Sequence, residues 1–475
     1  MQKISKIFVF LSYLYLILPI LIFTCMWCNP LVSILGFIII LSGTYFLFKN
    51  ANSLWFPSSK KEWITLVSLL VIAFIWVCSS GIGALVFQNS DHECRNFIFE
   101  LLVNQKSPVI LKYDNVQYIM TYYIGFWLSS AFVAKIFGNN VQLGYYLQVV
   151  WATIGVFLVF YYILSFFKNK NILPIIIFIF FSGLDFLGAK LVGFPTNAIS
   201  HLEWWYPDYQ FSSFTTQLYW VFNQAIPAWL VTLIILKEEN NKNILCLYSL
   251  AFLSATLPAI GMFPIVLYCL YKNSFKDKKF ELSLDYLKSF FKSICSYQNI
   301  ICAFFIVLLS LLYLTGNISG SQKTLSYFDI FDLLKFLLYF FLLEAGLYMI
   351  LIWKFNKKEP LFYIALVSLL IYPFIKVGIS NDFCMRATIP ALIILFLLII
   401  KTLFYSDILK YKKILTALII CLLFGAITPI HEMTRTIVCT RLGMKKIKVN
   451  DSFGSNFFAH TDNNLFYKYL GKHND

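Results

Sequence analysis

Long apolar runs constrain this chain more than any other feature. A helix that crosses a bilayer needs roughly 20 mostly apolar residues, and the sequence contains such runs at 7–28, 30–48, 63–87, 117–137, 141–167, 173–189, 215–236, 243–271, 299–315, 328–352, 359–378, 385–405 and 414–429. Of its 475 residues, 60% are hydrophobic and 13% are charged, whereas a soluble domain carries about 25% charged residues. We therefore expect an all-α fold, a polytopic transmembrane helical bundle of about 12–14 spans.

The positive charge does not indicate a nucleic-acid partner. The net charge is +15, but the lysines and arginines lie mainly between apolar runs, as the positive-inside rule predicts. The partners indicated by this pattern are membrane lipids, with Lys272–Lys292 facing anionic headgroups on the cytoplasmic side. No Walker, HExxH or GxSxG motif is present.

Loop charges predict the topology. Lys49, Lys60 and Lys61 place the second connection inside, so residues 88–116 become the first large outer loop. Residues 191–214 become the second outer loop under two coupled conditions. The 117–167 stretch would cross an odd number of times, with one piece shallow or re-entrant. The 243–271 run would be a re-entrant hairpin, broken around Gly261 by Pro258 and Pro264. We expect residues 1–430 to form the membrane domain and 431–475 a short extracytoplasmic cap. The Phe, Ile, Lys and Asn richness suggests a bacterial inner (cytoplasmic) membrane, with the site on the extracytoplasmic side.

The first outer loop offers a carboxylate. Ser90 and Glu93 fit a capping box, which predicts a short amphipathic helix on the outer leaflet with Asn96 on its polar face. Asp91 falls in the first turn of this helix. It either stabilises the positive end of the helix dipole, by about 0.3–1 kcal/mol, or acts as a general base.

The second outer loop crowds acids and aromatic residues together. Stacking on sugar rings and binding of hydroxyl groups would account for Glu203, Trp204, Trp205 and Asp208; an interfacial aromatic belt with incidental acids is the alternative. Three amides follow in an apolar helix, and they either line a cavity or bond between helices: Gln217, Asn223 and Gln224.

Two further segments carry arginines near the membrane boundary. Asp382 and Arg386 lie four residues apart and either neutralise each other or present an arginine to a lipid phosphate. Arg435 is either a second phosphate contact or a solvated charge.

Together these features resemble the GT-C superfamily of integral-membrane glycosyltransferases. The resemblance rests on a large outer loop with Asp91-His92-Glu93, on Tyr122–Gly125 followed by Lys135–Gly138, on Ser182–Asp185, and on Asn381–Pro390. It implies a GT-C-like bundle with short outer-face helices. We expect no large soluble carboxyl-terminal domain, which would favour a glycan or lipid-linked acceptor over a protein.

The resemblance also implies a reaction. A polyprenyl-phosphate-linked sugar would be the donor, and Asp91 would deprotonate the acceptor hydroxyl in an inverting displacement. Arg386, with Arg435 or His92, would hold the donor phosphate. Glu203, Asp208, Asp382 and the other second-loop residues would hold sugar or acceptor. We expect no metal or other cofactor, because hard cations prefer several oxygen ligands. A polysaccharide polymerase and a transporter or flippase for a lipid-linked glycan are the alternatives.

Overall fold

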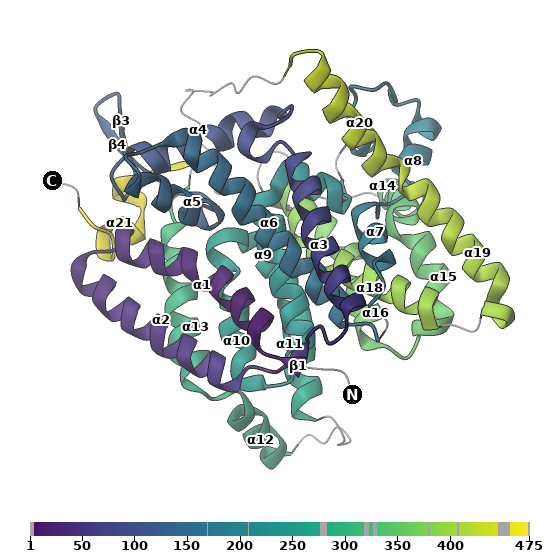
Figure 1. Ribbon diagram of the computed structural model, residues 1–475, viewed down its shortest axis with the longest axis horizontal. Helices are drawn as coiled ribbons and strands as arrows, with labels where there is room; N and C mark the ends of the chain where they lie inside the picture. The colour runs from purple at the N-terminus through teal and green to yellow at the C-terminus, as the bar shows by residue number, and fades with distance from the viewer. Residues whose placement is uncertain are drawn as a thin grey trace.

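The computed structural model describes residues 4–168, 170–207, 209–275, 283–317, 323–325, 330–377, 381–405, 408–444 and 457–473. Most of these residues are helical (Figure 1). Six single helices are long and apolar enough to cross a membrane: α1 (Ile7–Trp27), α2 (Pro30–Asn50), α3 (Lys60–Cys78), α6 (Val141–Ser165), α9 (Phe214–Lys237) and α11 (Phe252–Ser274).

Three more candidate spans are built from consecutive helices. The span Asp332–Asn356 is made from α14 (Ile330–Lys335), the π-helix η5 (Phe336–Gly346) and α15 (Leu347–Asn356). The span Asp382–Phe404 is made from α17 (Asp382–Ala387) and α18 (Ile389–Tyr405). The span Lys410–Arg441 is made from α19 (Ile408–Gly425) and α20 (Ile427–Arg441). A bent pair could add a tenth span; it comprises the end of α12 (Leu284–Ile294) with η3 (Gln298–Cys302) and α13 (Ala303–Tyr313).

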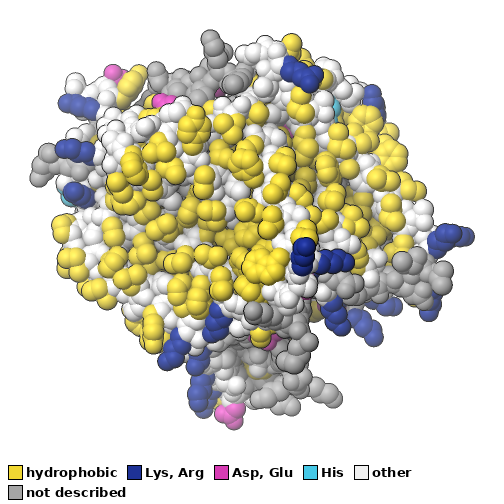
Figure 2. Space-filling model, viewed as in Figure 1, with side chains coloured by type: hydrophobic (Ala, Val, Ile, Leu, Met, Phe, Trp, Pro, Cys, Tyr) yellow, Lys and Arg dark blue, Asp and Glu magenta, His cyan; other side chains and the backbone are white. Residues whose placement is uncertain are grey.

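The chain is thus an all-α multi-pass membrane protein. Figure 2 shows a broad band of hydrophobic side chains across the molecule, with lysines and arginines at its margins. Among the described residues nine or ten helices could span the membrane, which is fewer than the expected 12–14. The difference arises because several apolar runs form short helices: α5 (Gly125–Ile136), α7 (Leu173–Ile179), α8 (Asp185–Val192) and α16 (Pro360–Ile371).

The 243–271 run folds back on itself as predicted, but the predicted position of the turn, at Gly261, is wrong. The run contains α10 (Asn241–Ser249) and α11, which lie antiparallel: Asn241 Nδ2 donates to the Leu270 carbonyl at 2.9 Å, and the Tyr248 hydroxyl donates to the Ala259 carbonyl at 2.9 Å. The chain turns between α10 and the start of α11, and both Pro258 and Pro264 lie inside α11 beyond this turn. The distortion falls at Ala255, one turn before Pro258, where φ is −145° and ψ is 55°. A proline removes a hydrogen bond to the preceding turn and crowds it, and helices inside a membrane protein tolerate this when their neighbours compensate.

The carboxyl-terminal segment adds a strand. It contributes β7 (Phe458–His460) to an antiparallel sheet with β3 (Ile110–Tyr113) and β4 (Val116–Met120), where Ile119 pairs with Ala459. The expected domain boundary at residue 430 falls inside α20. The remaining short elements are β1 (Ile4–Ser5), β2 (Leu54–Trp55), η1 (Ile82–Ala84), α4 (Ser90–Asn104), η2 (Leu202–Trp205), β5 (Lys323–Leu325), η6 (Tyr372–Phe374), β6 (Ile375–Val377), η7 (Thr461–Asn463) and α21 (Leu465–Tyr469).

Helix α9 is sharply bent near its amino-terminal end. Val221 leaves the helical conformation, with φ at −132° and ψ at 32°. The rings of Phe214 and Trp229 therefore lie 5.9 Å apart, although residues fifteen apart in a straight helix are separated by about 22 Å. Beside the bend, the carbonyl oxygen of Tyr219 accepts hydrogen bonds from Asn89 Nδ2 at 2.8 Å and His92 Nε2 at 2.9 Å.

Candidate functional site

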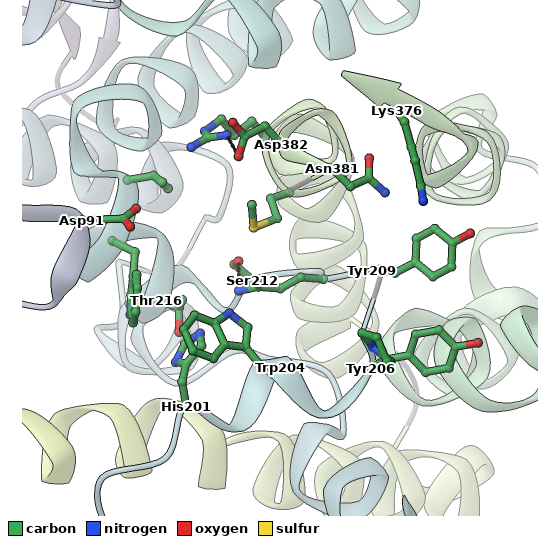
Figure 3. A pocket seen from close by; sticks show the side chains of 16 residues that line it. Asp91, His201, Trp204, Tyr206, Tyr209, Ser212, Thr216, Lys376, Asn381 and Asp382 are labelled. Atoms are coloured by element: carbon green, nitrogen blue, oxygen red, sulfur yellow. Dashed lines mark hydrogen bonds and ion pairs between the residues drawn. The ribbon is translucent and has the colours of Figure 1, made fainter. Parts of the chain in front are cut away.

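A cavity of about 520 Å³ opens beside the bend of α9. This volume lies within the roughly 300–1,000 Å³ of typical ligand pockets. Side chains from four separate segments of the chain line it (Figure 3). They are Asp91, His201, Trp204, Tyr206, Pro207, Tyr209, Gln210, Ser212, Thr216, Trp220, Val221, Lys376, Asn381, Asp382, Met385 and Arg386.

Asp91 reaches the cavity from the first turn of α4. Asn89, not Ser90, is the N-cap, and its Oδ1 accepts a hydrogen bond from the Asp91 amide at 3.1 Å. Arg95 Nη2 donates to Asp91 Oδ2 at 2.9 Å, while 42% of the Asp91 side chain stays exposed. The arginine therefore holds one carboxylate oxygen from behind, and the acid remains open to the cavity.

The rest of α4 packs into the bundle. Ile98, Phe99 and Leu102 are buried, and the helix contacts α5 and α6. The prediction that Asn96 lies on a polar outer face is wrong, because Asn96 is buried and donates to Gln88 Oε1 at 2.8 Å. A buried amide needs such a partner, so the helix has a polar residue within its packed face.

His92 supports the bend of α9 and does not line the cavity. Burial, and next the nearby Arg95 guanidinium, lower the pKa of His92 to about 4. The ring is therefore neutral at neutral pH, and its Nε2 donates to the Tyr219 carbonyl. This placement does not match the predicted role in binding a phosphate.

The second acidic residue of the cavity comes from α17. Asp382 and Arg386 form an ion pair one turn apart, and both line the cavity. The arginine is largely buried, with 9% of its side chain exposed, and its Nε has no hydrogen-bond partner among the described residues. Lys376 adds a second cation from β6 (Figure 3); nothing in the sequence around Lys376 distinguishes it from a loop lysine.

Aromatic side chains form one wall of the cavity. Trp204 is 54% exposed, and its ring lies 5.7 Å from that of Trp220; Tyr206 and Tyr209 also line the cavity. Trp205 is buried instead and donates from Nε1 to Glu344 at 2.9 Å. Asp208 lies outside the described residues.

Glu203 braces the second loop and does not line the cavity. It is 1% exposed and accepts hydrogen bonds from Gln210 Nε2 at 2.7 Å and from the Ser213 amide at 2.9 Å. Burial, and next the charge of Asp185, raise the pKa of Glu203. The structure thus places it behind the cavity wall, where a sugar does not reach it.

Glu432 on α20 is the centre of a network that the sequence analysis missed. Its carboxylate accepts from His201 Nδ1 at 3.0 Å, Trp220 Nε1 at 2.8 Å and Arg435 Nη1 at 3.0 Å. Burial lowers the pKa of His201, but the bonded Glu432 carboxylate outweighs this effect, so the pKa of His201 is raised. The acid one turn before Arg435 was the available signal.

Arg435 is held in this network and does not line the cavity. Besides its bond to Glu432, its guanidinium carbon lies 5.1 Å from the ring centre of Trp220 and 5.6 Å from that of Phe87. Arg435 therefore supports the aromatic wall from behind. Of the two cations that do line the cavity, only Arg386 was predicted from the sequence.

The three amides of α9 are buried in the bundle. Gln217 accepts from Trp229 Nε1 at 2.7 Å and donates to the Ser212 carbonyl at 2.7 Å, which ties the two sides of the bend together. Asn223 and Gln224 are fully buried, and their amides have no hydrogen-bond partner among the described residues. None of the three lines this cavity.

Neither a metal site nor a similar protein identifies the function. Within the described ranges no three His, Cys, Asp or Glu side chains are grouped to hold a metal ion. Comparisons with protein-family models, curated proteins and solved structures found no match to this chain.

Proposed function

We propose that this protein is a membrane glycosyltransferase. It transfers a sugar from a polyprenyl-phosphate-linked donor to a glycan or lipid-linked acceptor on the extracytoplasmic face, with inversion at the anomeric carbon. One observation carries the proposal: Asp91, Trp204 and the Asp382–Arg386 pair, which are far apart in sequence, line one cavity. A carboxylate, an aromatic wall and a cation are the groups that such a transfer needs.

The position of the cavity favours a lipid-linked donor. Thr216 and Trp220 come from the first turns of α9, and Met385 and Arg386 come from the start of the Asp382–Phe404 span. The cavity thus lies beside the first residues of candidate membrane spans, and in the proposed function it would lie near the lipid headgroups. A phosphate attached to a polyprenyl chain would reach the cations here without leaving the membrane.

Asp91 would act as the base. Its carboxylate takes the proton of the acceptor hydroxyl, the acceptor oxygen forms a bond to the anomeric carbon, and the bond from that carbon to the phosphate oxygen breaks. The electron pair of the broken bond stays on the polyprenyl phosphate. Arg95, bonded to Asp91 Oδ2, would hold the carboxylate in place.

Arg386 and Lys376 would stabilise the negative charge that develops on the leaving phosphate. An arginine matches phosphate oxygens through several N–H donors, and the Nε of Arg386 has no hydrogen-bond partner among the described residues. Trp204 and Trp220 would stack on the sugar, and Asp382 would accept bonds from its hydroxyls. In this arrangement Glu203, Glu432 and Arg435 support the wall.

A flippase for a lipid-linked glycan is the second candidate, and the bend of α9 favours it. Transporters often carry discontinuous membrane helices beside their substrate sites, and α9 is interrupted at Val221 next to the cavity. A flippase needs no base, whereas a transferase does. The two functions also differ in the membrane leaflet where the donor accumulates when the protein is absent.

The decisive experiment compares the native host with a deletion strain. Mass spectrometry of surface glycans and lipid-linked sugars would identify the missing product. Sealed vesicles would then be treated with an impermeant glycan-modifying reagent, and permeabilised vesicles would serve as the control. We expect the deletion strain to lack one sugar while its donor stays accessible from the outer face. A donor confined to the cytoplasmic face would instead support the flippase.

A further inference from the structure

A second polar site lies inside the bundle, away from the cavity lining. The apolar run at 173–189 forms two short helices, α7 and α8, with residues 180–184 between them in a non-helical conformation. Asp185 begins α8 and is 1% exposed. Glu344, from the middle of the Asp332–Asn356 span, is 2% exposed and lies against this break.

The break is built around the Glu344 side chain. A Cβ atom added at Gly183 would lie 2.0 Å from Glu344 Oε2 and 2.8 Å from the Cα of Glu344, so only glycine allows this approach. The Leu184 amide also donates to the Leu343 carbonyl at 3.1 Å. The two segments therefore meet through their backbones and bring the carboxyl group of Glu344 to that of Asp185.

The carboxyl oxygens of Asp185 and Glu344 do not all accept hydrogen bonds. Ser182 Oγ donates to Asp185 Oδ2 at 2.7 Å, and Trp205 Nε1 donates to Glu344 Oε1 at 2.9 Å. Glu344 Oε2 receives no hydrogen bond from any donor in the described part of the chain. None of the ion pairs in that part involves either acid. The other titratable side chains that face the pair are Glu203, Tyr348 and Cys384.

We infer that Asp185 and Glu344 form a proton-binding site, in which one proton shared by the two carboxyl groups holds the break between α7 and α8 to η5. Two carboxylates in contact inside a dry bundle cannot both be ionised. Asp185 keeps the charge because it accepts the Ser182 hydroxyl and lies at the amino end of α8. Glu344 carries the proton on Oε2 and donates it to Asp185, which accounts for the missing donor.

Trp205 connects this site to the wall of the cavity. Trp205 bonds to Glu344 and packs its ring over Gly188 of α8, and its neighbour Trp204 lines the cavity. Loss of the proton would place two charges beside each other and push apart the elements that position this wall. The inference rests on the fold and holds whichever of the two proposed functions is correct.

Infrared spectroscopy of the purified full-length protein tests the inference. Glu344→Gln keeps the shape and can still donate to Asp185, so we expect it to fold and to lose the C=O band of one protonated carboxyl group. Glu359→Gln is the control, because Glu359 is 39% exposed and paired with Lys401; it should lose only ionised-carboxylate bands. If Glu344→Gln also loses only ionised-carboxylate bands, the inference is wrong.

A second variant covers the case in which Glu344→Gln does not fold. Asp185→Asn should leave the proton on Glu344 but shift its C=O band, because the acceptor loses its charge. An Asp185→Asn spectrum with no change in any protonated-carboxyl band would overturn the inference. So would a change in the wild-type bands when Na⁺ and K⁺ are exchanged for choline, since that would show a metal cation between the acids.

Discussion

Two Asp–Arg pairs with the same i, i+4 spacing line the cavity in different ways. On α4, Asp91 faces the cavity while Arg95 lies behind it, with 4% of its side chain exposed and the ring centre of Phe222 6.0 Å away. On α17, both Asp382 and Arg386 line the cavity. The two aspartates are equally exposed, at 42% of their side chains.

The i, i+4 spacing alone therefore does not determine the role of an Asp–Arg pair. A pair that presents only its carboxylate is suited to accept a proton. A pair that also presents its guanidinium is suited to bind an anion. We therefore assign the base to α4 and the phosphate contact to α17, and the following predictions test this division.

Replacing the two aspartates should give the largest difference. Asp91→Asn removes the base and should lower the rate of product formation by about 10²- to 10⁴-fold. Asp382→Asn keeps a hydrogen-bonding group and should cost much less. Both are measured by glycan mass spectrometry in the complemented deletion strain at equal membrane protein levels. Glu93→Gln, on the same helix as Asp91 but outside the cavity lining, is the control.

The arginines should show the opposite order. Arg386→Ala removes a donor to the leaving phosphate and should lower the rate by about 10²- to 10³-fold. Arg95→Ala leaves the Asp91 carboxylate in the cavity, so its effect on turnover should be smaller once protein levels are matched. The same assay measures both variants. Equal losses would contradict the separate roles of the two pairs.

The α4 region should also carry a pH dependence of stability. The pKa of His92 is 6.5 in the unfolded chain and about 4 in the fold. Between these pH values the unfolded chain therefore binds a proton that the folded protein does not. The fold should lose up to about 3 kcal/mol as pH falls from 6.5 to 4. His92→Gln should reduce this loss in thermal unfolding scans of the solubilised protein, and an undiminished loss would contradict the prediction.

The aromatic wall should contribute the smallest effect. Trp204 is half-exposed and offers its ring to the cavity. Loss of one stacking partner costs about 0.5–1.5 kcal/mol, so Trp204→Ala should weaken donor use by roughly 2- to 12-fold. Trp63→Ala, at a distant exposed tryptophan of α3, is the control. The readout is product formed at limiting donor.

The fold could be predicted in outline from the sequence. Apolar length and loop charge identify a polytopic helical bundle, because lipid leaves few other structures for the backbone. The positions of the breaks in helices were not predictable: α9 bends at Val221, which is neither glycine nor proline, while the 243–271 run turns before Pro258 and α11 continues past both of its prolines. Such breaks depend on partners that are distant in sequence, such as Asn89 and His92 at the Tyr219 carbonyl.

The site could be predicted in part. Asp91, Trp204, Asp382 and Arg386 stand out because ionisable and aromatic residues at a membrane boundary are functional candidates, and all four line the cavity. Glu203, His92 and Arg435 have the same residue types, yet they face inward. Lys376 gives no signal in the sequence, because only the pairing of β6 with β5 and its closeness to α17 bring it to the cavity.

The most direct test of the central claim is the ratio of lipid-linked donor to finished glycan in membranes that contain wild-type protein or Asp91→Asn. A transferase without its base should bind and leave its donor intact. The account predicts that donor accumulates and product is absent with Asp91→Asn, at equal protein levels. A ratio equal to that of the wild type would contradict the assignment of Asp91 as the catalytic base.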